Sequence, residues 1–207
     1  MKKNVLDWRL RLLQKARIEL DNSQKVLDVG CGDGGDCAIF ADECNEVIGI
    51  DIEPQSDWAD IAKANVRLLT ADACHLPLPD NYFDIVFAKD ALHHIEYHKK
   101  AIEEMKRVAK RGGKVLVLEA NRYNPILYLH MTLLKKHQHF TQPYFKKLMQ
   151  DSFGDASFLC VEAHVLPTVA ISALGLFNQV EDMLEHVPLV RNYLSYNIAL
   201  AEKNNQE

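Results

Sequence analysis

The stretch Val26-Leu-Asp-Val-Gly-Cys-Gly-Asp-Gly-Gly35 decides the fold of this chain. A short apolar run, residues 25–29, leads into the glycines, and residues 37–44 follow them with a helical pattern. Glycine lets the backbone turn sharply and lets a ligand approach without interference from a Cβ atom, while the amides at the helix start point toward that ligand. The stretch therefore predicts a ligand-binding loop between a strand and a helix.

Strands and helices alternate on both sides of this loop. We expect strands at residues 25–29, 46–50, 66–70, 83–88 and 113–118, with helices at 4–20, 37–44 and 97–110. After residue 120 we expect helices at 125–136 and 142–153, β-like runs at 157–165 and 193–201, and a further helix between these runs. Short apolar strands that alternate with helices indicate an α/β fold, with a mostly parallel sheet covered on both faces.

Composition narrows the class of protein. The 207 residues are 48% hydrophobic, which favours one compact domain. The formal net charge is -5, and a negative charge argues against a nucleic-acid binder. Five cysteines without a C-x-x-C pair argue against a disulfide framework or a zinc ribbon. The longest apolar region, residues 158–177, contains Glu162, His164 and Pro167 and does not fit a membrane span. With no secretory signal visible, we expect a cytoplasmic protein.

The glycine pattern alone leaves two cofactors open. Gly30, Gly32 and Gly35 satisfy G-x-G-x-x-G, and Asp51 follows at the spacing of a ribose-binding acid, so an NAD(P)-dependent oxidoreductase is one alternative. Asp28, however, places a carboxylate at the end of the first strand. That charge is awkward beside a pyrophosphate but suits a cation such as the amino group of a methionine moiety. The charge pattern therefore favours S-adenosyl-L-methionine.

Further stretches carry a family resemblance. They are VLDVGCGDGG at 26–35, VIGIDI at 47–52, ADACHLPLPDNYFDIVFAKDALHHI at 71–95 and RGGKVLVLEAN at 111–121. In order and spacing the chain resembles the class I S-adenosylmethionine-dependent methyltransferases, in particular the branch with the ubiquinone and menaquinone methyltransferases. The resemblance implies a Rossmann-like seven-stranded sheet in the order 3-2-1-4-5-7-6 with an antiparallel last strand. It also implies methyl transfer that leaves S-adenosyl-L-homocysteine as product.

The expected cofactor site lies at the ends of the first four strands. Asp28 faces the methionine amine, Asp72 accepts from the adenine amine, and by resemblance Asp51 holds both ribose hydroxyls. The expected cofactor-binding residues are Asp28, Gly30, Cys31, Gly32, Gly34, Asp51, Ile52, Asp72, Ala73 and Lys89. An Asx turn is the competing structural explanation for Asp72.

We expect one methyltransferase domain over residues 1–207. It divides into an N-terminal helix in 1–22, a cofactor-binding core in 23–121, and substrate-side helices with a C-terminal β-hairpin in 122–207. A relative that binds the cofactor without transferring the methyl group stays an alternative to the enzyme.

Three histidines follow the fourth strand. His93, His94 and His98 invite a metal hypothesis, but no acidic or cysteine ligand stands at a spacing that completes a set, so we expect no metal. They are interpreted as structural, with His94 the one candidate for a general base.

Acceptor residues are expected after the fifth strand. Arg122, Asn124 and Tyr128 lie there among apolar neighbours, and residues 168–177 form a second apolar cover. Two apolar covers over the expected pocket motivate the hypothesis of a small-molecule or lipid-like acceptor, with peripheral contact to a membrane.

Overall fold

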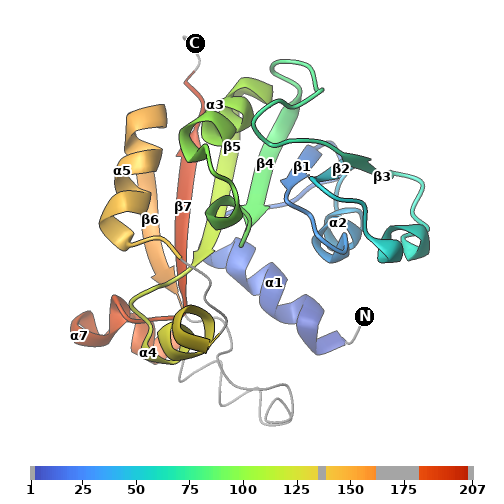
Figure 1. Ribbon diagram of the computed structural model, residues 1–207. Coiled ribbons are helices and arrows are strands. Elements are labelled where there is room, and N and C mark those ends of the chain that lie inside the picture. The colour runs from blue at the N-terminus through green and yellow to red at the C-terminus, as the bar shows by residue number, and fades with distance from the viewer. Residues whose placement is uncertain (1–2, 135–138, 162–181, 205–207) are drawn as a thin grey trace.

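A seven-stranded sheet forms the centre of the molecule (Figure 1). The computed structural model describes residues 3–134, 139–161 and 182–204. The strands stand in the order β3-β2-β1-β4-β5-β7-β6, so the expected topology is confirmed. Their bounds are β1 Lys25–Val29, β2 Glu46–Asp51, β3 Val66–Thr70, β4 Phe83–Lys89, β5 Ala109–Ala120, β6 Ala156–Val161 and β7 Tyr196–Glu202.

Strand directions follow the predicted pattern. The first five strands pair in parallel, with Val29 opposite Ile50 on one side and Ala88 on the other. β7 runs antiparallel to both β5 and β6. The inner strands are buried along nearly their whole length, as a parallel sheet covered on both faces requires.

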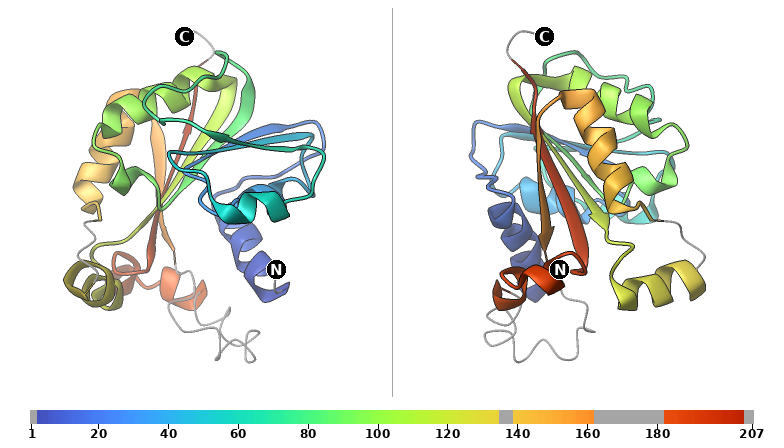
Figure 2. Two further views of the ribbon diagram at one scale, coloured as in Figure 1. Left: turned by 45° about the vertical axis from the view of Figure 1, so that its right-hand side comes forward. Right: turned by 90° about the vertical axis from the view of Figure 1, so that its left-hand side faces the viewer.

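Helices cover the sheet on both faces, so the domain has three layers (Figure 2). On one face, α1 (Lys3–Lys15) and α2 (Gly35–Phe40) bury a cluster that includes Leu12 and Phe40. On the other face, α3 (His98–Val108) and α5 (Gln142–Phe153) pack around Met105, Phe145 and Met149. Each fully buried side chain of this size stabilises the fold by about 1.5–3 kcal/mol relative to exposure. Within the described part of the chain, no helix is both long and apolar enough to cross a bilayer.

Two early helices are shorter than predicted. α1 ends at Lys15 because Arg17 adopts a left-handed backbone conformation with φ 57°, and the chain then turns toward β1. α2 ends at Phe40 rather than continuing through Cys44. There the side-chain amide of Asn65 donates to the carbonyls of Ala41 and Cys44, both at 2.9 Å, and so satisfies the carbonyl groups of the turn.

Other boundaries also differ from the expectation. β5 begins at Ala109, inside the stretch predicted as helix, because α3 ends at Val108. After β5 the chain forms a short α4 (Pro125–Leu127) and then a π-helix, η3 (Tyr128–Leu134). The expected helix between the last two strands lies mostly outside the described residues; residues 182–185 are helical and are followed by α7 (Pro188–Arg191). Two 3-10 turns, η1 (Ser56–Asp60) and η2 (Leu92–His94), complete the connections.

Candidate functional site

The glycine loop leaves the carboxyl end of β1 in a conformation that other residues rarely adopt. Gly30, Gly32 and Gly34 all have positive φ, at 73°, 52° and 76°. A Cβ on Gly30 would lie 2.4 Å from the Cβ of Ala91, so the loop and the segment after β4 touch there. At Gly32 a Cβ would meet nothing within 4 Å. The first glycine thus serves close packing, and the second faces open space where a ligand can approach.

Asp51 and Trp58 hold Gly32 from two sides. The Asp51 carboxylate at the end of β2 accepts a hydrogen bond from the Gly32 amide at 2.8 Å. The Trp58 indole on η1 donates to the Gly32 carbonyl at 2.7 Å. Ile52, next along the chain, is exposed. The sequence analysis named Asp51 and Ile52 but missed Trp58, because nothing in its spacing links it to the loop.

Asp28 is a buried carboxylic acid beneath the glycine loop. Its side chain is 2% exposed and accepts from the Cys37 thiol at 3.3 Å. Burial, together with the negative charge of Asp36, raises the pKa of Asp28 to about 7, although the Cys37 hydrogen bond and the positive charges of Lys89 and Arg9 oppose that shift. A cation placed beside this carboxyl group would return its pKa toward the ordinary value.

Asp36 joins three elements beside Asp28. Its carboxylate pairs with Arg9 of α1 at 2.9 Å, and with Lys89 at the end of β4. This arrangement brings Lys89, one of the expected cofactor-binding residues, within the charged surroundings of Asp28. Arg9 and Asp36 were not predicted, since an arginine on an amphipathic helix gives no sign of its partner.

Asp72 forms a tight turn after β3. Its carboxylate accepts from the Cys74 amide at 2.8 Å and lies 3.2 Å from His75 Nδ1. The Cys74 hydrogen bond, followed by the His75 contact, lowers the pKa of Asp72, so it is ionised near neutrality. This is the Asx turn that competed with the adenine contact, and the carboxylate is half exposed. The adenine contact of Asp72 and Ala73 stays a prediction.

A second polar group lies at the carboxyl ends of β4 and β5. Asp90, with φ 51°, accepts from the Tyr196 hydroxyl at 2.6 Å and from the Ala120 amide at 3.2 Å. Burial raises the pKa of Asp90. Glu119 accepts from the Leu92 amide at 2.8 Å. A buried acid, Glu119, and a partly buried one, Asp90, therefore stand where the strands end, and the sequence analysis predicted neither.

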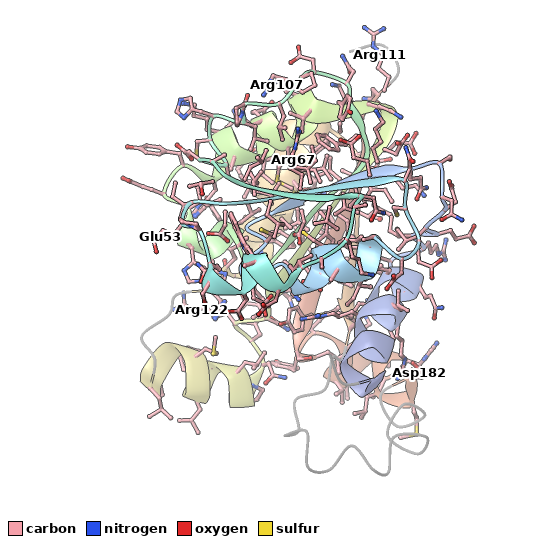
Figure 3. The ribbon with its side chains drawn as sticks, turned by 90° about the vertical axis from the view of Figure 1, so that its right-hand side faces the viewer. Glu53, Arg67, Arg107, Arg111, Arg122 and Asp182 are labelled. Atoms are coloured by element: carbon pink, nitrogen blue, oxygen red, sulfur yellow. The ribbon has the colours of Figure 1, made fainter. Side chains whose placement is uncertain are left out.

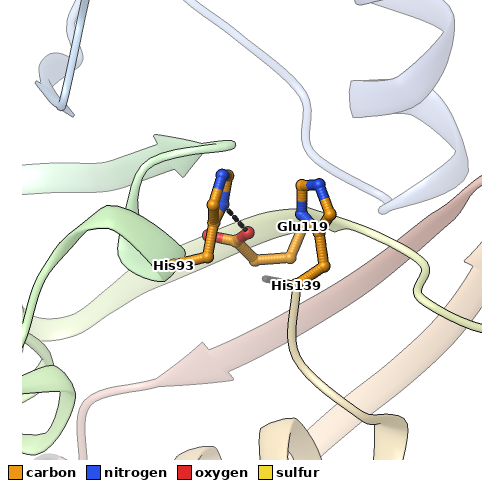
Figure 4. A group of neighbouring side chains, drawn as sticks. All are labelled: His93, Glu119 and His139. Atoms are coloured by element: carbon orange, nitrogen blue, oxygen red, sulfur yellow. Dashed lines mark hydrogen bonds and ion pairs between the residues drawn. The ribbon is translucent and has the colours of Figure 1, made fainter. Parts of the chain in front are cut away.

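The histidines after β4 lie on two elements, His93 and His94 in η2 and His98 at the start of α3. His93 Nδ1 lies 2.7 Å from Glu119 Oε2, and His139, just before α5, joins this pair (Figure 4). Burial alone would lower the pKa of His93, but the hydrogen bond with Glu119 and the negative charges of Glu119 and Asp90 together outweigh that effect and raise it. His94 is exposed, and His98 starts α3 and contacts the Tyr144 hydroxyl at 2.8 Å. The sequence showed no acidic residue at a spacing that would complete a metal site with these histidines. In the structure Glu119 on β5 lies beside His93.

The expected acceptor residues divide into two kinds. Asn124 is buried and uses both ends of its amide, donating to the Tyr193 carbonyl at 2.8 Å and accepting from the Leu127 amide at 3.0 Å. These bonds explain Asn124 as a structural residue of the segment after β5. Tyr128 is exposed and Arg122 is half-buried, and their contact with an acceptor stays a prediction.

Basic residues at and just after the end of α3 form ion pairs with neighbouring acids. Arg107 binds Glu104 and Asp80, and Lys110 pairs with Asp84 at 2.7 Å. Figure 3 shows Arg107 and Arg111 at the end of the molecule opposite to Arg122 and Asp182. These basic residues therefore do not line the loop end of the sheet.

Comparisons with known proteins identify the family of the chain. Residues 27–117 match the family model described as a methyltransferase domain. The chain is 31% identical over 171 residues to the demethylmenaquinone methyltransferase of Geobacillus sp. (strain WCH70), covering 78% of this chain and 71% of that protein.

Solved structures show the same fold at lower identity. One is phosphoethanolamine N-methyltransferase 2 of Haemonchus contortus in complex with S-adenosyl-L-methionine; the TM-score is 0.71 at 19% identity, covering 95% of this chain and 53% of that one. Another is a Haloferax volcanii methyltransferase in complex with the Trm112 activator; the TM-score is 0.70 at 16% identity, covering 95% and 90%.

The fold defines a Rossmann-like α/β enzyme of the methyltransferase type. The chain belongs to the class I S-adenosylmethionine-dependent methyltransferases. Its cofactor is S-adenosyl-L-methionine. Family membership decides against the NAD(P) oxidoreductase and the non-catalytic alternative.

Proposed function

We propose that this enzyme transfers the methyl group of S-adenosyl-L-methionine to a hydrophobic small molecule of the phenol or quinol class. The exposed apolar surface after β5 is the observation that supports this acceptor. The relationship to demethylmenaquinone methyltransferases points the same way.

The residues present fit the cofactor. Asp28 would face the methionine ammonium, because a buried carboxyl group whose pKa is about 7 gains a partner from a nearby cation. The open side of Gly32 leaves room for the ligand, and the Asp51 carboxylate beside it would accept from the ribose hydroxyls. Ile52, Asp72 and the remaining loop residues complete the proposed site. When bound, the cofactor supplies a methyl group on a sulfonium, which transfers in line to an acceptor lone pair.

The apolar surface lies on residues 123–134, directly after β5. Leu129, Leu133 and Leu134 are 57%, 55% and 70% exposed, and Tyr123 and Tyr128 are exposed beside them in the sequence. Large apolar side chains gathered in this way are typical of a surface that binds a lipid or an apolar ligand. We therefore place acceptor entry along residues 123–134, which we call the apolar segment. The second expected cover, 168–177, lies outside the described residues.

A phenolic acceptor keeps its proton near neutral pH, so transfer to it benefits from a base. His94 is exposed at the end of β4, and its ring centroid lies 4.0 Å from that of His93. We propose His94 as that base.

Methyl transfer to a panel of acceptors tests the proposal. Labelled S-adenosyl-L-methionine would be supplied with short-chain quinols, with long-chain quinols in lipid vesicles, and with water-soluble catechols. We expect transfer to quinols, and a double variant Leu133→Ser, Leu134→Ser should lose most transfer to the vesicle-borne acceptor while keeping cofactor binding. Leu189→Ser on α7, where the native side chain is 86% exposed, is the matched control. Transfer to the water-soluble acceptors alone, or equal loss in the Leu189 variant, would contradict the proposal.

A further inference from the structure

His93, Glu119 and His139 meet at one buried point (Figure 4). They come from three different parts of the chain: η2, β5 and the segment before α5. The side chains of His93 and Glu119 are 3% and 1% exposed, and His139 is buried. One ligand-type atom of each residue lies within 4.8 Å of the corresponding atoms of the other two.

The chemistry of these groups matches a specific kind of ligand. Two imidazole nitrogens and one carboxylate oxygen are donors that divalent zinc-class ions bind well. In a tetrahedral site with bonds of about 2.0–2.2 Å, ligand atoms stand about 3.3 Å apart. The observed separations need only modest side-chain movement to reach that geometry. The two histidine rings are tilted by 51° at a centroid distance of 4.4 Å, so they are not stacked flat against each other.

The surroundings orient the carboxylate and supply charge. The Leu92 amide donates to Glu119 Oε1, while Oε2 faces His93. Such a hydrogen bond to the other oxygen of a ligand is typical of metal sites. Asp90 is a second, partly buried acid that acts electrostatically on both His93 and Glu119. Two carboxylates can balance one divalent cation in this buried region.

We propose that His93, Glu119 and His139 bind one divalent transition-metal ion of the zinc class. None of its three residues belongs to the glycine loop or to the apolar segment. Its existence does not depend on the identity of the methyl acceptor, so the proposed function can fail while this proposal holds.

Cobalt binding to the full chain tests the site without any methyl-transfer assay. The purified protein would be treated with a chelator, freed of it, and titrated with Co²⁺ while the visible absorption is recorded. We expect bands of low-symmetry cobalt that saturate at one equivalent and disappear on addition of Zn²⁺. Glu119→Gln keeps the size of the side chain and an oxygen for the Leu92 amide, and it should weaken Co²⁺ binding at least about a hundredfold.

Two further variants keep the test decisive. His139→Gln removes another ligand and replaces Glu119→Gln if that variant does not fold. His186→Gln is the matched control, because His186 is exposed and contacts the Asp182 carbonyl rather than this group. Binding of S-adenosyl-L-methionine and cooperative thermal unfolding report that each variant is folded. A folded native chain without cobalt bands, equal bands in Glu119→Gln, or loss of the bands in His186→Gln would each overturn the proposal.

Discussion

Cofactor affinity should depend on pH through Asp28. The carboxyl group is buried, and its pKa of about 7 means that it is partly protonated in the cofactor-free protein at neutral pH. Only the ionised form can attract the ammonium of S-adenosyl-L-methionine. The charged groups that act on it are Asp36 on α2, Lys89 on β4 and Arg9 on α1.

The size of the effect follows from the ionised fraction. Roughly one Asp28 side chain in eleven is ionised near pH 6, and about three in four near pH 7.5. If binding requires the ionised form, the dissociation constant should fall about eightfold between about pH 6 and pH 7.5. Binding near pH 6 should also release close to one proton into the buffer.

Isothermal titration at both pH values, in buffers of different ionisation enthalpy, measures the affinity and the proton release. The Asp28→Asn variant is the control, because it has no proton to lose and reports only the titration of the cofactor's own amine. 5′-Methylthioadenosine, which has no ammonium group, should bind the native protein with little change over this range. Equal pH dependence in the native protein and in Asp28→Asn would refute the reasoning.

The same substitution has a predictable effect on stability. The folded pKa of about 7 lies above the ordinary value of 3.8, so the protonated acid stabilises the fold at low pH, and this contribution is lost as the pH rises through 7. Above that pH, cofactor-free Asp28→Asn should unfold at a higher temperature than the native protein. The gain has an upper limit of about 4 kcal/mol. A less stable variant at alkaline pH would contradict this assignment.

Three further substitutions test the loop and the strand ends. Gly30→Ala should cost about 2–4 kcal/mol, because it combines a left-handed backbone with a contact of 2.4 Å, whereas Gly154→Ala, with φ 75° and open space, should cost about 1 kcal/mol; equal shifts in urea unfolding would contradict the packing argument. Asp51→Ala should weaken S-adenosyl-L-methionine binding by about 1–3 kcal/mol in calorimetry, and unchanged affinity would remove Asp51 from the site. Tyr196→Phe should lower the free energy of unfolding by about 1–3 kcal/mol, since the partly buried Asp90 loses its hydroxyl donor. A Tyr196→Phe variant as stable as the native chain would show that Asp90 finds another donor.

The central fold was predictable because its signals are local. The predicted strands at 25–29 and 46–50 coincide with β1 and, to within one residue, with β2, since buried parallel strands read as short, mainly apolar stretches. β3 also matches its prediction at 66–70, although it is an edge strand without a fully buried residue. The strand order came instead from the family resemblance. The predicted ends of helices and strands were less accurate. α2 ends early where the side chain of Asn65, which lies far along the sequence, donates to the carbonyls of the following turn.

The site was predictable only where its residues stand in a motif. Asp28 and Asp51 follow strands at fixed spacing from the glycines. Trp58 and His139 reach their partners through tertiary packing, which leaves no periodicity or spacing for a sequence to display. Burial, which sets the pKa of Asp28, also depends on neighbours from several elements.

The position of β7 has a consequence for how the chain is made. β7 stands between β5 and β6, although it is the last of the seven strands to be synthesised. Until residues 196–202 have left the ribosome, β5 has an open edge and β6 has no neighbour in the sheet. Unpaired apolar edges of this kind can pair with other chains. Nascent chains that stall before β7 should therefore depend on chaperones, and fragments that end near residue 190 should aggregate while the full chain stays in solution.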